Sequence, residues 1–202
     1  HGEDFTSLKG KELREARKKL KIIFQDPYSS LNPRMTVRDI IAEPIDIEKT
    51  WKTRSEREEM VLETMRLVGL DPTWINRYPH EFSGGQRQRI GIARAIILKP
   101  DIVICDEPVS ALDVSIQAKI INLLKQLQEE LNISYIFISH DLGVVKHIAD
   151  RILVMYLGHV VEEGTSEDIF NHPSHPYTRT LLNAIPTIGV EMSENTLIEG
   201  CT

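Results

Sequence analysis

Two short uncharged runs, separated by one long amphipathic segment, constrain the fold of this chain more than any other feature of its sequence. The runs at residues 102–105 and 135–138 are rich in Ile, and polar residues follow each of them directly. Between them, residues 115–131 carry Ile and Leu at helical spacing along one face. Strands that are apolar on both faces are typical of parallel sheets. Strand, helix and strand in this order predict an α/β fold with a mainly parallel sheet.

Other segments extend this pattern on both sides. Residues 9–21 hold seven Lys or Arg side chains with Leu and Ala at helical spacing, which favours a solvated amphipathic helix over a nucleic-acid patch. The remaining predicted elements are a strand at 21–24 that ends at Gln25, helical segments at 36 to about 78 and at 84–98, a hairpin at 151–162, and a capping box at 165–168 before a short helix.

Composition restricts the class of protein further. The 202 residues carry 24 Lys and Arg against 30 Asp and Glu, and a net charge of -6 argues against a general nucleic-acid binder. Cys105 and Cys201 are too far apart in the sequence to suggest a disulfide framework or a metal site, so a reducing compartment is expected. No apolar run approaches the roughly 20 residues that a membrane-spanning helix needs. The composition therefore favours a soluble, mildly acidic globular protein.

Candidate site residues follow three of the predicted strands: Gln25, the pair Asp106-Glu107, and His140. In open parallel sheets, ligands bind beyond the carboxyl ends of the strands, so we expect these residues to converge on one site. A carboxylate such as Asp106 can hold Mg²⁺, and the adjacent Glu107 can polarise a water molecule. The alternative is that the two acids are ordinary surface residues after a strand.

The start of the predicted helix at 84–98 has the residues of a phosphate-binding site. Its sequence is Ser83-Gly84-Gly85-Gln86. The glycines leave backbone N–H groups unobstructed, the helix dipole adds positive potential, and the Ser hydroxyl supplies a further donor. The alternative is a glycine-rich helix cap without a ligand.

Residues 82–89, with Ala93-Arg94-Ala95 after them, resemble the signature motif of ATP-binding cassette (ABC) ATPases, with Phe82 where Leu is more usual. Four further motifs of that family occur in the family's order: Gln25 resembles the Q-loop, residues 102–107 the Walker B motif, residues 110–113 the D-loop, and His140 the switch histidine. The resemblance implies a P-loop NTPase (RecA-like) core with a parallel sheet and an ABC helical subdomain.

A narrower resemblance covers most of the chain. Residues 24–35, 108–117 and 172–178 resemble the ATP-binding subunits of oligopeptide and dipeptide importers, whose motifs nickel importers share. This resemblance implies an ATPase that couples ATP hydrolysis to solute uptake, and it leaves the transported solute open. His172 and His175 are disfavoured as a metal pair, because prolines flank them and no third ligand is near in the sequence.

The resemblance also divides the chain into four parts. Residues 1–26 correspond to a remnant of the N-terminal part of the ATPase core up to the Q-loop, and residues 27–98 to the helical and signature subdomain. Residues 99–164 correspond to the RecA-like core with Walker B, D-loop and switch histidine. Residues 165–202 correspond to the start of the C-terminal extension of oligopeptide transporters.

A Walker A motif, Gly-x-x-x-x-Gly-Lys-[Ser/Thr], does not occur in the 202 residues. Members of the family carry it several tens of residues before the Q-loop, so we expect this chain to be a fragment without the first strands and the phosphate loop. On this expectation, the chain alone binds Mg-ATP poorly and hydrolyses it negligibly. The missing strands also predict an uncovered sheet edge beside residues 102–105.

The resemblance implies a role for each residue at the strand ends when ATP lies between two ATPase subunits. Asp106 and Gln25 help to organise Mg²⁺. Glu107 orients or deprotonates the attacking water, and His140 contacts the γ-phosphate. Catalysis of this kind consists of positioning and charge stabilisation.

The same resemblance implies partners. They are a second ABC ATPase subunit, identical or a sister, and transmembrane permease subunits that contact the helical region; no nucleic acid is implied. The expected location is the cytoplasmic face of the membrane. Further residues are implied to act on the partner's nucleotide or to couple the two sites: Ser83, Gly84, Gly85 and Gln86 for the nucleotide, and Asp113 for the coupling.

Two alternatives remain open. A non-catalytic ABC-type interaction module can keep the signature motif and the permease-binding surface without holding its own ATP. A non-transport ABC ATPase is disfavoured, because residues 25–83 leave no room for a long coiled-coil arm and the chain has no zinc-finger cysteines.

Overall fold

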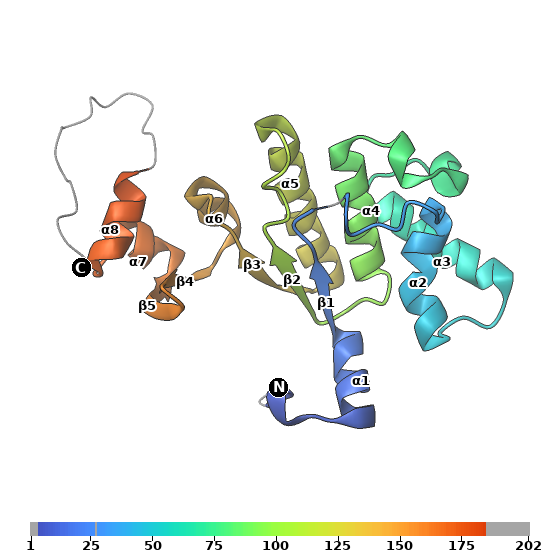
Figure 1. The fold of residues 1–202 in the computed structure, drawn as a ribbon, viewed down its shortest axis with the longest axis horizontal. Coiled ribbons are helices and arrows are strands. Elements are labelled where there is room, and N and C mark those ends of the chain that lie inside the picture. Colours follow the sequence, from blue (N-terminus) through green and yellow to red (C-terminus); the bar gives the residue numbers. More distant parts are fainter. Residues whose placement is uncertain (1–3, 27, 185–202) are drawn as a thin grey trace. The chain divides into compact units, whose positions relative to one another are not determined.

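The computed structural model describes residues 4–26 and 28–184, and Figure 1 shows the course of the chain. Two compact units divide it, His1–Ile148 and Ala149–Thr202, and each is described here by itself. Cys201 and the last part of the predicted extension at 165–202 lie outside the described residues. The predicted four-part division remains a prediction.

A parallel sheet forms the centre of the first unit. Its strands are β1 (Leu20–Ile23), β2 (Ile102–Asp106) and β3 (Ser134–Ile138), in the order β1-β2-β3. Ile23 pairs with Cys105, and Cys105 pairs with Phe137, so the carboxyl ends of the three strands lie at the same edge. The prediction of a parallel sheet is confirmed.

β2 is the central strand of this sheet. It pairs with β1 on one side and with β3 on the other, so the prediction of an uncovered edge beside residues 102–105 is wrong. The physical reason is that an apolar strand buries most surface when both of its edges are paired. Among the strands that the structure describes in this unit, the outer edges belong to β1 and β3.

Six α-helices accompany the sheet in the described part of the first unit. They are α1 (Gly10–Lys19), α2 (Val37–Glu48), α3 (Arg54–Leu67), α4 (Gly84–Ile96), α5 (Val114–Leu131) and α6 (Leu142–Ile148), with short 3-10 helices at Phe5–Ser7, Pro72–Asn76 and Pro79–Glu81. Side chains cap four helix starts by accepting backbone N–H bonds: Thr36, Thr53, Ser83 and Asp113. α1 contains no buried residue, which confirms the prediction of a solvated helix.

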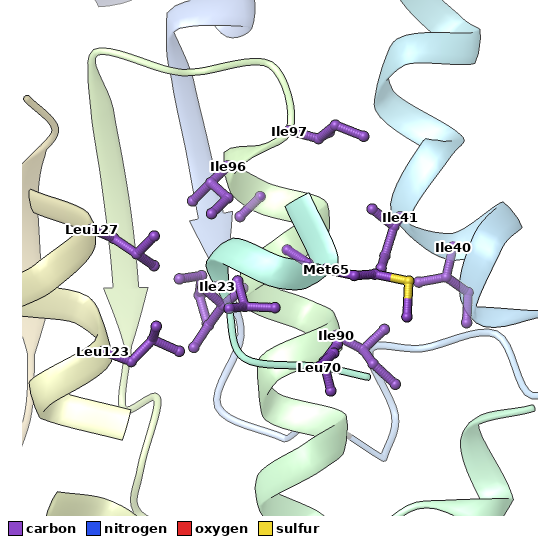
Figure 2. Close-up of a cluster of buried hydrophobic side chains, with 14 of the residues drawn as sticks. Ile23, Ile40, Ile41, Met65, Leu70, Ile90, Ile96, Ile97, Leu123 and Leu127 are labelled. Atoms are coloured by element: carbon purple, nitrogen blue, oxygen red, sulfur yellow. The ribbon is translucent and has the colours of Figure 1, made fainter. Parts of the chain in front are cut away.

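One hydrophobic core joins the helices to the sheet. α2, α3 and α4 pack together, and α4 also contacts β1 and α5 (Figure 1). Figure 2 shows the apolar side chains at this junction: Ile41 of α2, Met65 of α3, Ile96 of α4, Ile23 of β1 and Leu127 of α5. The elements that carry the site residues are therefore fixed to one another by shared apolar packing.

The two faces of the sheet differ in exposure. Val103 and Cys105 face the core and are fully buried. On the other face, Ile22, Ile104 and Ile136 stand side by side across the three strands. Ile22 is 37% exposed and Ile136 51% exposed. An apolar row thus remains open in the described structure.

The second unit begins with an antiparallel hairpin. β4 (Arg151–Tyr156) pairs with β5 (His159–Thr165), which confirms the predicted hairpin. α7 (Ser166–Asn171) and α8 (Pro176–Asn183) follow. The Thr165 hydroxyl accepts the Asp168 N–H at 3.1 Å and so starts α7 as predicted. Across the described ranges of both units, none of the helices has the length and apolarity to cross a membrane.

Candidate functional site

Three predicted site residues meet at the carboxyl edge of the sheet. Gln25 Nε2 donates a hydrogen bond to Glu107 Oε2 at 2.8 Å. His140 Nδ1 lies 2.9 Å from Glu107 Oε1. Both carboxylate oxygens of Glu107 are therefore engaged, one by a residue after β1 and the other by a residue after β3. The expectation that these strand ends converge is confirmed.

The backbone of Glu107 adopts an unusual conformation. Its φ of 44° lies in the left-handed region, which few residues other than glycine adopt. The Glu107 N–H donates to the carbonyl of Ile138 at 3.0 Å, and the Glu107 carbonyl accepts from the Ser110 hydroxyl at 3.0 Å. Hydrogen bonds to β3 and to the following turn thus hold a strained residue in place, as is common at functional sites.

The charge of Glu107 acts on His140. The pKa of His140 is raised above its usual value, first by the hydrogen bond to the Glu107 carboxylate and then by the negative charge of that group, to which Asp141 adds. The His140 side chain is 71% exposed and that of Glu107 is 24% exposed. Solvent therefore screens the pair, and its main consequence is a greater population of the charged imidazolium.

Asp106 is the last residue of β2 and pairs in register with Ile138. It stands directly before Glu107, so its carboxylate and the Gln25 amide belong to the same edge of the sheet. Oxygen donors of these kinds suit Mg²⁺, which usually takes only one or two protein ligands and fills its shell with phosphate oxygens and water. In residues 4–26 and 28–184, no three His, Cys, Asp or Glu side chains gather as a metal-binding group.

The predicted phosphate-binding segment forms the start of α4. Ser83 caps the helix, its hydroxyl accepting the Gln86 N–H at 3.4 Å, while Gln86 Oε1 accepts the Ser83 N–H at 2.9 Å. The first N–H groups of an α-helix have no partner within the helix. The N-terminus of α4 therefore keeps the donors that an anion can bind, and two of the predicted residues, Ser83 and Gln86, hold each other in position.

Close packing explains the glycines at this helix start. A Cβ added to Gly85 would lie 2.5 Å from Cγ2 of Ile116, and one added to Gly84 would lie 3.3 Å from Cδ2 of Leu112. α4 thus rests directly on the start of α5 and on the loop before it. Sequence reasoning connected these glycines with phosphate binding or with a glycine-rich helix cap, and it missed the packing, for which the sequence holds no local signal.

Asp113 caps α5. Its Oδ1 accepts the Ile116 N–H at 3.1 Å and the Ser115 hydroxyl at 2.8 Å. Both bonds lower the pKa of Asp113, and the bond from the Ser115 hydroxyl has the larger effect.

The predicted site residues fall into two groups. No hydrogen bond between described residues joins Asp113, Ser83 or Gln86 to Glu107. Of the predicted site residues, the structure thus gathers one group at the sheet edge and a second where α4 meets α5.

Three further side chains position these loops. The sequence analysis placed each of them within a motif of the resemblance but gave none of them a role. Gln117 Nε2 donates to the carbonyls of Val109 and Leu112, each at 3.0 Å, and so fixes the loop between β2 and α5. Arg87 and Arg94 of α4 contact the loop after Gln25. Their spacing of seven residues places both on one face of the helix.

The fold and these two groups of residues define a class of protein. The family model described as ABC transporter matches residues 1–110. A second model, described as the C-terminal region of oligopeptide/dipeptide transporters, matches residues 161–201. The chain belongs to the ABC transporter family.

Individual relatives point in the same direction. The oligopeptide transport ATP-binding protein OppF of Salmonella typhimurium is 56% identical over 198 residues, which are 98% of this chain and 59% of the relative. The dipeptide transport ATP-binding protein DppF of Lactococcus lactis is 58% identical over 186 residues, 92% of this chain and 60% of the relative. The chain thus spans about three fifths of the length of these curated relatives.

A solved structure confirms the predicted fold class. It is a dimeric ATP-binding cassette in a post-hydrolysis state, bound to ADP and Pi, and it is 31% identical to this chain with a TM-score of 0.68. The match covers 79% of this chain and 68% of that one. The α/β architecture with a parallel sheet is therefore that of an ABC ATPase domain, a P-loop NTPase fold.

Proposed function

We propose that the protein is the ATP-binding and ATP-hydrolysing subunit of an ABC importer for oligopeptides or dipeptides. The observation that carries this proposal is the Glu107 carboxylate, which Gln25 and His140 hold at the carboxyl edge of the parallel sheet. This edge is where open α/β sheets bind their ligands. The substrate class rests on the match at residues 161–201 and on the names of the relatives.

Mg²⁺ would be held by Asp106 and Gln25. One is a carboxylate and the other an amide, and both present the oxygen donors that this cation prefers. When bound, the ion neutralises negative charge on the phosphate oxygens. The position of Asp106 directly before Glu107 puts the metal ligand and the proposed base on the same strand end.

Glu107 acts as the general base in this proposal. It takes a proton from the water that attacks the γ-phosphorus, while the bond from that phosphorus to the oxygen of the departing ADP breaks. Gln25 and His140 each use one acceptor position on a different Glu107 oxygen, which leaves further lone pairs for the water. His140, whose raised pKa favours the imidazolium, donates a hydrogen bond to the γ-phosphate.

The group at the start of α4 serves a second ATPase subunit in this proposal. Ser83, Gly84, Gly85 and Gln86 offer N–H and hydroxyl donors to the phosphate held by that subunit, which is identical or a sister. Asp113, at the start of α5, couples the two sites. The dimeric ATP-binding cassette among the solved structures supports this arrangement. Transmembrane permease subunits contact the region of α2 and α3 and keep the protein at the cytoplasmic face of the membrane.

In the test, Glu107 is replaced in the full-length protein, which is assembled with its ATPase and permease partner subunits. Glu107→Gln keeps the side-chain shape but cannot accept a proton, so nucleotide binding is retained and phosphate release falls by a factor of about 10² or more. Glu129→Gln, at an exposed position on α5, is the matched control and leaves the rate unchanged. Hydrolysis at the original rate in the Glu107→Gln variant would show that Glu107 is not the base.

A second experiment tests the substrate class. Cells are expected to take up labelled dipeptides and oligopeptides, and this uptake is expected to be lost in the Glu107→Gln variant.

A further inference from the structure

A cavity of about 390 Å³ opens where α3, α4 and α5 meet, which is a volume typical of small-molecule sites. Each helix contributes one cationic side chain to its wall: Arg66 from the last turn of α3, Arg89 from α4 and Lys119 from α5. Asn122 and Gln126, one and two turns after Lys119, add amide groups. None of the described residues that line this basic cavity is Asp or Glu.

The three cations lack an acidic partner in the part of the chain that the structure describes. None of the ion pairs found there includes Arg66, Arg89 or Lys119. Glu130, which is not part of the wall, accepts a hydrogen bond from Gln126 Nε2 at 2.8 Å. Positive groups that share one cavity repel one another, and an anion between them removes that repulsion.

Most of the Arg89 guanidinium remains available to a ligand. Its Nη1 donates to the carbonyl of Val68, at the end of α3. A guanidinium has five N–H donors, so this bond leaves others for an anion. Burial lowers the pKa of Arg89, because desolvation disfavours the charged form, and no neighbouring carboxylate among the described residues counteracts this effect. A bound anion would counteract it.

Gly69 keeps the wall of the cavity open beside Arg89. Its φ of 69° lies in the left-handed region that favours glycine. A Cβ at this position would lie 3.0 Å from Arg89 Nη1. The turn after α3 therefore brings backbone, and not a side chain, against the guanidinium.

Local structure explains two of the cations but not their meeting with the third. Arg66 in the last turn of α3 and the Arg89 contact with Val68 both suit the negative end of a helix dipole. Lys119 lies in the interior of α5, and its ammonium group makes no hydrogen bond or ion pair to a described residue. Its place in the wall is better explained by a ligand than by the stability of α5.

The arrangement of the cations favours a phosphate group over a carboxylate. They come from three helices and so approach a central ligand from different sides. A phosphate monoester has three outer oxygens that point in different directions and carries a charge of about -1.5 to -2 at pH 7. A carboxylate has two oxygens in one plane and a single charge. Arginine also binds phosphate through two N–H groups at once, and lysine binds it as a point charge.

We propose that the basic cavity binds the phosphate group of a small soluble molecule, with Arg66, Arg89 and Lys119 as its ligands. The site is separate from the signature residues Ser83 and Gln86. Neither of them lines the cavity, and Arg89 lies about 9 Å further along the axis of α4 than Ser83. The inference therefore does not depend on the proposed ATPase function.

The experiment is a calorimetric titration of the full-length protein with inorganic phosphate at constant ionic strength. The proposed nucleotide site is filled beforehand with Mg²⁺ and a non-hydrolysable ATP analogue, so that phosphate does not enter it. Arg66→Gln and Lys119→Gln, both at exposed positions, each weaken phosphate binding by about fivefold or more, because each removes a charge-assisted contact. Lys125→Gln, at an exposed position of α5 outside the cavity, is the matched control and changes the affinity by less than about twofold.

A second measurement locates the bound phosphate. In NMR spectra of the full-length protein, the Nε–H signal of Arg89 is expected to shift as inorganic phosphate is added, and to shift far less in a double variant with Arg66→Gln and Lys119→Gln. Acetate at the same ionic strength is expected to cause a much smaller shift.

Three results would overturn the inference. The first is equal phosphate affinity in the double variant and in the Lys125→Gln control, and the second is an Arg89 signal that does not respond to phosphate. The third is a response to acetate as large as that to phosphate, which contradicts the ligand class. Binding to vesicles that contain phosphatidic acid, without a response to inorganic phosphate, would indicate a lipid headgroup and contradict a soluble ligand.

Discussion

At the scale of single residues, Glu107 is the point on which the candidate site depends. It combines a left-handed backbone at φ 44° with a carboxylate that contacts both Gln25 and His140. A strained residue whose side chain joins three strand ends is better explained by chemistry than by stability.

The contact between His140 and Glu107 can be tested by measuring the pKa of His140. NMR titration of the His140 ring is expected to give a pKa above the ordinary value of about 6.5. Glu107→Gln removes the charge and lowers the pKa toward that value, whereas Asp141→Asn lowers it less, because Asp141 contributes least. A His140 pKa that is the same with and without the Glu107 charge contradicts the contact.

The sign of the linked stability follows from the raised pKa. The pair contributes stability that is fully present below the unfolded-state pKa of about 6.5, and this contribution is lost as the pH rises through the higher folded-state pKa. Because the His140 side chain is 71% exposed, the contribution is small.

At the scale of elements, α4 connects the two groups of site residues. Its N-terminal end packs on α5 through Gly85 and Ile116, and its side holds the loop after Gln25 through Arg87 and Arg94. A helix that packs on two different loops restrains the positions of both. Substitutions in α4 that avoid every nucleotide-facing group are therefore expected to affect hydrolysis.

The contact between Gly85 and Ile116 allows a compensation experiment. Gly85→Ala overpacks the contact, at a cost of about 1–3 kcal/mol, because the new methyl lies 2.5 Å from Ile116 Cγ2. Ile116→Leu has no Cγ2 and restores hydrolysis in the Gly85→Ala background. Ile116→Val keeps that methyl and is the matched control without rescue. Equal activity of the two double variants would mean that Gly85 is required for phosphate approach alone.

The convergence of Gln25, Glu107 and His140 could be predicted from the sequence, because apolar strand patterns are local and parallel strands share their carboxyl edge. The contact of Arg87 with Tyr28 and that of Gly85 with Ile116 could not. Each joins segments that are distant along the chain, and no periodicity encodes which side chains meet across a turn. The order of strands is non-local in the same sense, which is why the central position of β2 was missed.

At the scale of the whole molecule, the first unit carries an apolar row that its described elements leave open. Ile22, Ile104 and Ile136 form this row across the sheet, beside the unpaired edge that β3 has among the described strands. Exposed apolar surface next to an open strand edge favours association with further polypeptide.

Expressed as residues 1–202 alone, the polypeptide is therefore expected to self-associate. Light scattering after gel filtration should report species larger than the 23.1 kDa monomer. Ile136→Thr keeps the preference for a strand but makes the face more polar, and it should reduce the larger species. Ile47→Thr, at an exposed Ile of α2 away from the sheet, is the control. A monomeric 202-residue polypeptide contradicts this expectation.

The two contacts of the Glu107 carboxylate also bear on the state of the site before nucleotide binds. Gln25 on one oxygen and His140 on the other use two of the roughly four acceptor positions of the carboxylate, so its orientation is fixed while room for a water molecule remains. Under the proposed function, the base is therefore oriented before any phosphate arrives, and little reorganisation is needed at the moment of reaction.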